Sequence, residues 1–207
     1  MDMELLLYIV DHLGVAVFAV AGTLLAFRKN LDGFGVIVLA AVTAIGGGTL
    51  RDLMLDLPVF WVHDPIYLYT IAAAAVLTIL WLRLRDYIHQ TTLLVADAVG
   101  VAFFTVMGAQ KAMMAGFSPL ICVIMGTMSA CFGGMLRDVL VRDIPMVLKG
   151  ELYATTCLVG GSVYVVMVEF TPALALLVGG LTTLLMRLGA IRWQWTLTVF
   201  HEHGGPR

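Results

Sequence analysis

The sequence contains two short motifs in which glycines are followed closely by an arginine and an aspartate. Residues 46–52 read GGGTLRD and residues 133–138 read GGMLRD. Each glycine costs an α-helix about 1 kcal/mol relative to alanine, so we expect the helix to bend or open at these clusters. A bent helix frees backbone carbonyl groups, which at membrane depth must face protein or water. Carbonyl oxygens beside a wet path are suitable partners for a partly dehydrated monovalent cation.

The same glycines have a structural interpretation, because small residues let transmembrane helices pack closely. The duplication of the cluster favours a bend at a functional site. Polar residues close to both clusters could assist an ion. The predicted ion-path residues are Thr43, Gly46, Gly47, Gly48, Thr49, Ser129, Gly133 and Gly134.

Charged side chains accompany the glycines, and a charge at hydrocarbon depth is usually paired or faces a cavity. Structural pairing and lining of the path are equally good interpretations of both Arg-Asp pairs. The lysine of the fourth apolar segment either reaches the headgroups or faces the path. Asp11 and Asp97 are explained as first-turn carboxylates that complement a helix dipole. The charged candidates near the path are Arg51, Asp52, Lys111, Arg137 and Asp138.

The composition places these motifs in a membrane protein. Of the 207 residues, 61% are hydrophobic and 13% are charged, with a mean hydropathy of +0.98. Soluble domains are close to half apolar and a quarter charged, so the bilayer is the natural solvent for this chain. We find no phosphate cradle, zinc motif or serine nucleophile motif. We therefore predict no enzyme, no metal site, no nucleic-acid partner and no cofactor other than permeant K⁺ or Na⁺.

Seven apolar segments are separated by short polar loops, which predicts an all-α integral membrane protein with seven transmembrane helices. Some segments fall short of the roughly 20 residues that a straight span needs, which fits helix ends that lie in a protein-lined interior. The expected helices cover residues 4–27, 33–55, 65–82, 92–114, 119–141, 151–168 and 172–186.

The first half of the chain superimposes on the second at a constant shift of 86 positions. Asp11 matches Asp97, Tyr67 matches Tyr153, and the two glycine motifs match each other. Each half has three helices, an odd number, so the second half enters from the opposite face of the membrane. We expect two inverted three-helix repeats and one further helix. The expected division is residues 1–90, 91–170 and 171–207.

Lysine and arginine are unevenly shared between the two sides. With the N-terminus outside, the outer side holds Lys111 alone. Cytoplasmic loops carry the excess of positive charge, so we expect the N-terminus outside and the C-terminus in the cytoplasm. The basic residues on the inner side are Arg28, Lys29, Arg83, Arg85, Arg142, Lys149, Arg187, Arg192 and Arg207.

The sequence resembles a known family. The resemblance is carried by RKNLDGFGVIVLAAVTAIGGGTLRDLML with PVFWVHDPIYLY, and by FGGMLRDVLVRDIP in the second half. These stretches are similar to the prokaryotic branch of the trimeric intracellular cation (TRIC) channels, also labelled the glycine transporter domain family. The resemblance implies a homotrimer among membrane lipids in the cell (inner) membrane. It also implies one pore per protomer, lined by the second and fifth helices, which are kinked at their glycines. Phe132 stands where the first cluster has Gly46, so the second bend should be less open.

The sequence leaves two main functions open, and an assembly scaffold is a third alternative. The first is a passive channel for monovalent cations, chiefly potassium. The second is a secondary transporter for glycine or another small amino acid, since such transporters also use broken helices near the midplane. The sequence shows no buried charge pair outside the Arg-Asp motifs that could bind both ends of an amino acid, which favours the channel.

Overall fold

The structure is a computed structural model that describes residues 3–84 and 90–198. These residues form α-helices and one short 3₁₀-helix, with a single isolated β-bridge between residues 151 and 196. The elements are α1 (Met3–Arg28), α2 (Gly33–Met54), α3 (Phe60–His63), α4 (Ile66–Arg83), α5 (Gln90–Met114), α6 (Pro119–Leu140), η1 (Met146–Leu148), α7 (Ala154–Met167) and α8 (Pro172–Trp193).

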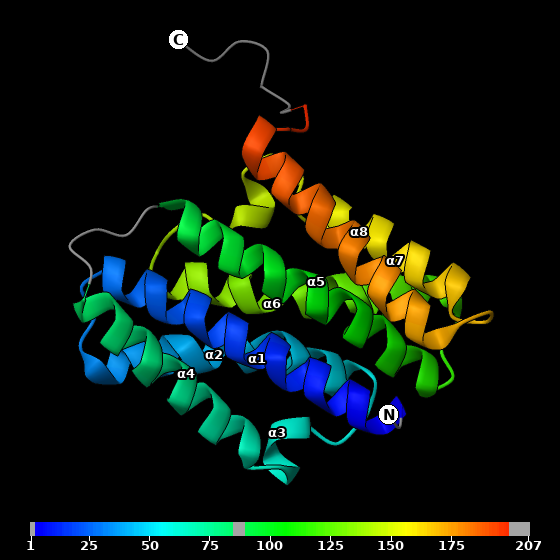
Figure 1. The fold of residues 1–207 in the computed structure, drawn as a ribbon, viewed down its shortest axis with the longest axis horizontal. Helices are drawn as coiled ribbons and strands as arrows, with labels where there is room; N and C mark the ends of the chain where they lie inside the picture. The colour runs from blue at the N-terminus through cyan, green and yellow to red at the C-terminus, as the bar shows by residue number, and fades with distance from the viewer. Residues whose placement is uncertain (1–2, 85–89, 199–207) are drawn as a thin grey trace.

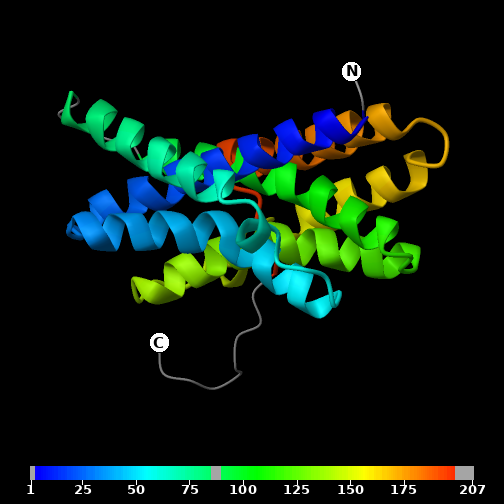
Figure 2. The same ribbon diagram turned by 90° about the horizontal axis from the view of Figure 1, so that it is seen from below.

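The helices form one bundle in which α1 and α5 pack against each other at the centre (Figure 1). Helices α2 and α4 pack against α1, while α6, α7 and α8 pack against α5. Helices α2 and α6 also contact each other, and Figure 2 shows them from below. The fold therefore brings together the two helices that carry the glycine motifs.

Apolar side chains cover the outside of the bundle. In the described part of the chain, six helices are long and apolar enough to cross a membrane, and α7, with 14 residues, is a shorter apolar helix. Large apolar residues such as Phe34, Leu77 and Phe170 are more than half exposed. A surface of this kind is stable only against lipid or another protein, which fits the predicted all-helical membrane protein.

Turns at matching positions of the two halves have the same backbone conformation. Asn30 and Gly116, which follow α1 and α5, have positive φ angles of 54° and 84°. Asp56 and Arg142, which follow α2 and α6, have φ angles of 54° and 58°. Both pairs are separated by 86 residues. The local geometry therefore recurs at the shift that the sequence predicts.

Helix ends differ from the prediction in the last third of the chain. The sixth long segment becomes helical only at Ala154, because η1 and an irregular segment precede it. The last helix continues to Trp193, so the prediction that Arg187 lies in a loop on the basic side is wrong. Arg187 is fully buried inside α8. Its charge is paired with Glu151, a contact that helical periodicity does not reveal.

Candidate functional site

Helices α2 and α6 cross at their glycine clusters with the two backbones in contact. A methyl group on Gly47 would overlap the carbonyl oxygen of Ser129, and one on Gly133 would overlap the carbonyl oxygen of Thr43. The two contacts are reciprocal, since Thr43 and Ser129 are 86 residues apart, as are Gly47 and Gly133. Residues without a side chain let helices approach this closely. Close packing is therefore one role of these two glycines.

Both helices remain α-helical through their glycine clusters. Helix α2 is continuous from Gly33 to Met54, and α6 is continuous from Pro119 to Leu140. The prediction that the helices open at the glycines is therefore wrong, whereas a bend within a continuous helix stays a prediction. The close contact between the helices offsets the intrinsic cost of glycine, so neither helix has to break.

The remaining glycines of the clusters face side chains of other elements. A methyl group on Gly48 would lie 2.7 Å from the ring of Phe60, and one on Gly134 would lie 3.1 Å from the hydroxyl of Tyr153. Gly46 faces an apolar side chain of α6. Gly48 is therefore covered by an aromatic ring, whereas the matching Gly134 of the second cluster lies beside a hydroxyl group.

The two predicted threonines are engaged in hydrogen bonds of their own helix. The hydroxyl of Thr43 donates to the carbonyl of Leu39 at 2.6 Å, and that of Thr49 donates to the carbonyl of Ile45 at 2.7 Å. Thr49 also accepts a hydrogen bond from the indole of Trp61 at 2.9 Å. Thr43 is buried at the crossing, whereas Thr49 joins α2 to α3.

The first Arg-Asp motif forms the Arg51 cluster, which consists of Arg51, Asp52, Lys111, Ser129 and Phe60. Nε of Arg51 donates to Oδ1 of Asp52 at 2.8 Å, and its Nη1 donates to the hydroxyl of Ser129 at 3.4 Å. Nζ of Lys111 lies 3.0 Å from Oδ2 of Asp52, which also accepts the backbone N–H of Phe60 at 3.1 Å. The Phe60 ring centre lies 5.8 Å from Arg51 Cζ and 5.6 Å from Lys111 Nζ. Two cations thus share one carboxylate and one aromatic face.

The second motif forms the Arg137 cluster, which consists of Arg137, Asp97, Asp138 and Met146. Nε of Arg137 donates to Oδ1 of Asp138 at 2.9 Å, and its Nη1 donates to Oδ1 of Asp97 at 2.9 Å. Oδ2 of Asp138 accepts the backbone N–H of Met146 at 3.1 Å. The three charged residues are all buried. Here one cation is shared by two carboxylates, which stabilises a charge that burial would otherwise make costly.

Three polar atoms beside Gly134 have no hydrogen-bond partner in the described part of the chain. They are Oδ2 of Asp97, Nη2 of Arg137 and the hydroxyl of Tyr153. A methyl group on Gly134 would lie 3.1 Å from the Tyr153 hydroxyl, 3.4 Å from Asp97 Oδ1 and 3.6 Å from Arg137 Nη2, so the three side chains converge. Buried polar groups normally have partners, so this point is suited to a small polar molecule that both donates and accepts hydrogen bonds.

Sequence reasoning missed the place of Asp97 in this cluster. A carboxylate complements the helix dipole only in the first turn of a helix. Helix α5 begins at Gln90, so Asp97 lies beyond that turn. That explanation of Asp97 is therefore wrong, because the residue is paired with Arg137. The shift of 86 residues gives no signal for this pairing, because it matches Asp97 to Asp11, which is bonded to Tyr67.

A pocket lies beside each cluster, at opposite ends of α1. The Arg51 pocket has a volume of about 320 Å³ and is lined mainly by α1 and α5, with single residues from α2, α3 and α4. The Asp138 pocket has a volume of about 290 Å³ and lies between α1, α5 and the segment around η1. The charged lining residues are Glu4, Asp11, Arg51 and Lys111 in the first pocket, and Arg28, Lys29, Asp138, Asp143, Lys149 and Glu151 in the second.

Two aromatic rings fill the space between α1 and α5 that separates these pockets. Phe18 and Phe104 stack with their ring centres 5.1 Å apart, and each is 1% exposed. Glycines make room for them, since a methyl group on Gly100 would overlap the Phe18 ring and one on Gly14 would lie 3.3 Å from Phe104. The middle of the bundle is therefore apolar, whereas both ends are polar.

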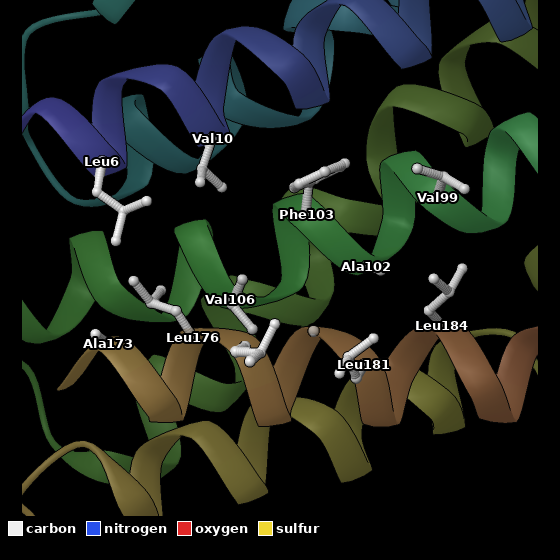
Figure 3. A pocket seen from close by; sticks show the side chains of 12 residues that line it. Leu6, Val10, Val99, Ala102, Phe103, Val106, Ala173, Leu176, Leu181 and Leu184 are labelled. Atoms are coloured by element: carbon white, nitrogen blue, oxygen red, sulfur yellow. The ribbon is translucent and has the colours of Figure 1, made fainter. Parts of the chain in front are cut away.

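A third pocket, of about 300 Å³, lies between α1, α5 and α8 (Figure 3). Its labelled side chains include Val10 from α1, Phe103 from α5 and Leu181 from α8, and every side chain that lines it is apolar. Such a surface suits lipid acyl chains or apolar protein side chains. It does not offer the polar groups that a hydrated ion requires.

The sequence comparisons identify a family. A family model described as "Glycine transporter" matches the chain twice, over residues 8–83 and 94–169. The UPF0126 membrane protein of Vibrio cholerae serotype O1 is 49% identical over 198 residues, covering 94% of this chain and 83% of the relative. The UPF0126 inner membrane protein YadS of Escherichia coli K12 is 46% identical over 200 residues, covering 95% of this chain and 97% of the relative.

A solved structure shares the fold. The TRIC trimeric intracellular cation channel orthologue from Rhodobacter sphaeroides has a TM-score of 0.85 and 37% sequence identity, covering 92% of this chain and 99% of that chain. The family model is described as a transporter and the solved structure as a cation channel, and neither of them is an enzyme. The chain therefore belongs to the glycine transporter (UPF0126) family of membrane proteins and has the fold of the prokaryotic TRIC channels.

Proposed function

We propose that this protein is a channel for monovalent cations, chiefly potassium, with one ion path in each subunit along α2 and α6. The observation that carries the proposal is the pair of pockets at opposite ends of the bundle, each lined by charged side chains beside one Arg-Asp motif, in a chain with the TRIC fold. Two vestibules that contain charged side chains, separated by a short apolar barrier, are the arrangement expected of a pore that is closed at its centre.

The barrier itself supports this proposal. At the crossing, the carbonyl oxygens of Thr43 and Ser129 lie against glycines, so they become available to an ion when the helices separate. Carbonyl oxygens replace part of the hydration shell of a cation. The neighbouring rings of Phe18 and Phe104 keep the closed path dry, and an apolar constriction prevents ion passage by excluding water.

We also propose seven spans, arranged as two inverted three-helix repeats and a final helix, with residues 1–90, 91–170 and 171–207 as the three parts. The reciprocal contacts of Gly47 and Gly133 support this arrangement, as does the double match of the family model at an offset of 86 residues. Inverted repeats commonly place the pathway at their interface, which here is the crossing of α2 with α6.

The proposed orientation places the Asp138 pocket in the cytoplasm and the N-terminus outside. The basic residues Arg28, Lys29 and Lys149 line that pocket, and basic residues concentrate on the cytoplasmic side. Arg85 and Arg207, which belong to the same prediction, lie outside the described residues. The relative from Escherichia coli is an inner membrane protein and the solved relative is described as trimeric. We therefore propose a homotrimer surrounded by inner-membrane lipids.

Single-channel recording in a planar bilayer tests the channel. We expect ohmic openings whose reversal potential, under a KCl gradient, shifts toward the potassium equilibrium potential. Gly47→Ala, which places a methyl group against the Ser129 carbonyl, should abolish the current, whereas Gly33→Ala, where nothing lies within 4 Å, should preserve it. A silent bilayer containing folded wild-type protein would refute the proposal.

Transport of glycine is the second candidate, and one observation favours it. Asp97 and Arg137 present unpartnered atoms beside the Tyr153 hydroxyl, so a buried carboxylate and a guanidinium could bind the two ends of an amino acid. The sequence shows no buried charge pair outside the Arg-Asp motifs. The ion pair between Asp97 and Arg137 corrects that argument, because Asp97 lies outside both motifs. Saturable, gradient-dependent uptake of labelled glycine into proteoliposomes would support this candidate, and its loss in Asp97→Asn would assign the site.

A further inference from the structure

The segment between η1 and α7 is held by α8, the helix that follows the two matching halves of the chain. Nη2 of Arg187 lies 3.0 Å from Oε2 of Glu151, and its Nη1 donates to the carbonyl of Leu152 at 3.2 Å. The guanidinium also lies over the ring of Tyr153, with Cζ 4.7 Å from the ring centre. One buried side chain of α8 thus contacts three consecutive residues of this segment.

Residues that follow α8 hold the same segment from a second side. The Leu197 N–H donates to the carbonyl of Gly150 at 2.6 Å, and the Leu152 N–H donates to the carbonyl of Trp195 at 3.3 Å. These bonds form a short antiparallel bridge. The segment is therefore clasped between the end of α8 and the chain that leaves it.

The clasped segment is one wall of the Asp138 pocket. Met146, Lys149 and Glu151 line that pocket, and Glu151 is 38% exposed at its side chain while Arg187 is fully buried. A buried cation that loses its partners is strongly destabilised. Movement of the wall away from α8 would leave the Arg187 charge buried and unpaired, so Arg187 opposes that movement.

The matching wall of the Arg51 pocket is held in a different way. Residues 60–67 are anchored to α1, because the hydroxyl of Tyr8 donates to Oδ2 of Asp64 at 3.0 Å and the hydroxyl of Tyr67 donates to Oδ2 of Asp11 at 2.6 Å. Lys111 of α5 also lies over the ring of Phe60 in this wall. None of these anchors, within the described part of the chain, comes from α8.

The residues of α1 that anchor this wall are Tyr8 and Asp11. The matching residues of α5 do not form the equivalent hydrogen bonds in the described part of the chain. The two matching positions hold Leu94, whose side chain cannot form a hydrogen bond, and Asp97, which is paired with Arg137. We propose that Arg187 is a positioning residue of the ion path, which holds residues 150–153 against α8 and thereby limits the opening of the Asp138 pocket without affecting the Arg51 pocket. Its effect on ion flow rests on the proposed channel function, whereas its effect on the pocket does not.

Thiol labelling measures the opening of each pocket separately. Leu93 lines the Asp138 pocket and is 6% exposed, and Leu7, which lies 86 positions earlier, lines the Arg51 pocket. We would place Leu93→Cys and Leu7→Cys in turn and measure their reaction with a charged methanethiosulfonate reagent in detergent-solubilised protein. The native cysteines are buried, so the chain without the added cysteine provides the blank.

We expect Arg187→Gln to raise the labelling rate of Leu93→Cys about tenfold, which corresponds to the loss of about 1.4 kcal/mol from the closed wall. The rate at Leu7→Cys should stay the same. Arg187→Lys keeps the charge but loses the forked geometry, so it should give an intermediate rate. Equal acceleration at both cysteines, or none at Leu93→Cys, would overturn the proposal.

Shortening the chain at its C-terminus tests the same proposal without changing Arg187. Ending the chain after Gln194 removes the bridge to residues 150–152, so it should also accelerate labelling at Leu93→Cys. Ending it after Thr198 keeps the bridge and should not. Recording the same variants in a planar bilayer separates the two proposals. If the Arg187 variants change the labelling rate but no variant conducts, the channel is refuted and the positioning role is supported. If the protein conducts but the labelling rate is the same in every variant, the channel is supported and the positioning role is refuted.

Discussion

The Arg51 and Arg137 clusters occupy matching places in the two halves of the chain, yet they have opposite formal charges. The first combines two cations with one carboxylate, and the second combines one cation with two carboxylates. The difference begins where α5 has Lys111 and the matching position of α1 has Leu25. Without a second cation, the Arg137 cluster recruits Asp97 instead. A repeated backbone therefore does not imply repeated electrostatics.

The tyrosines follow the same difference. Tyr67 donates its hydroxyl to Asp11 at 2.6 Å, whereas the hydroxyl of Tyr153 has no partner among the described residues because Asp97 is paired with Arg137. The hydroxyl of Tyr67 is thus satisfied internally, whereas Tyr153 and its neighbours present polar atoms that a water, an ion or a substrate could use.

The largest contrast is expected when each arginine is removed. Arg137→Gln leaves two carboxylates buried without their cation, and breaking a buried pair in this way costs about 3–5 kcal/mol. Arg51→Gln leaves Asp52 paired with Lys111, so we expect a smaller loss. Thermal unfolding of detergent-solubilised protein, followed by fluorescence, measures both. Equal losses in the two variants would contradict the difference between the clusters.

The glycine crossing is where the two halves should behave alike. Gly47→Ala and Gly133→Ala each place a methyl group against the opposing backbone, and overpacking of this kind costs about 1–3 kcal/mol. Gly33→Ala, where nothing lies within 4 Å, is the matched control and should be close to neutral. The same unfolding measurement applies, and a loss in only one of the two crossing variants would show that the contact is not reciprocal.

The tyrosine contrast is expected to be smaller. Tyr67→Phe removes a hydrogen bond to Asp11 and should cost about 1 kcal/mol. Tyr153→Phe removes a buried hydroxyl that has no partner among the described residues, so it should be neutral or slightly stabilising. Unfolding midpoints in the same detergent provide the comparison. A larger loss for Tyr153→Phe would show that its hydroxyl is bound to a ligand or to water.

The smallest effect on stability is expected at Lys111, where current is the sharper measurement. Its side chain is 34% exposed, so Lys111→Leu should change stability by less than about 1 kcal/mol. Removing this positive charge from the Arg51 pocket should raise potassium current. Leu25→Lys adds a cation beside the Asp138 pocket and should lower it. Changes in the same direction for both variants would show that pocket charge does not control cation entry.

The membrane class, the helical segments and the shift of 86 residues could be predicted because they are properties of local sequence. Apolar length determines whether a helix crosses a bilayer, and six of the expected segments form helices of that kind among the described residues. The seventh, α7, is shorter than expected because η1 and the clasped segment occupy the residues before it. Turn conformations such as that of Asp56 recur because the residues that follow α2 and α6 match.

The opening of α2 and α6 was predicted from glycine propensity and is wrong because propensity is a property of an isolated helix. At Gly47 the opposing backbone supplies the contact that offsets its cost. Pairing within each Arg-Asp motif is one of the two interpretations that the sequence offers, and the structure shows both pairs. The additional partners, Lys111 and Asp97, are not predicted. The sequence predicts Arg187 as a loop residue, whereas Glu151 and Tyr153 accommodate its charge inside the bundle.

The sequence by itself determined that this chain is a membrane protein of duplicated helices, because hydropathy and a constant shift are read along the chain without knowledge of contacts. Only the tertiary structure decided which side chain pairs with which. Asp97 lies 40 residues from its partner Arg137, and Glu151 lies 36 residues from Arg187. Pairings over such separations depend on how the helices pack, because a buried charge takes whichever partner the packing brings within reach.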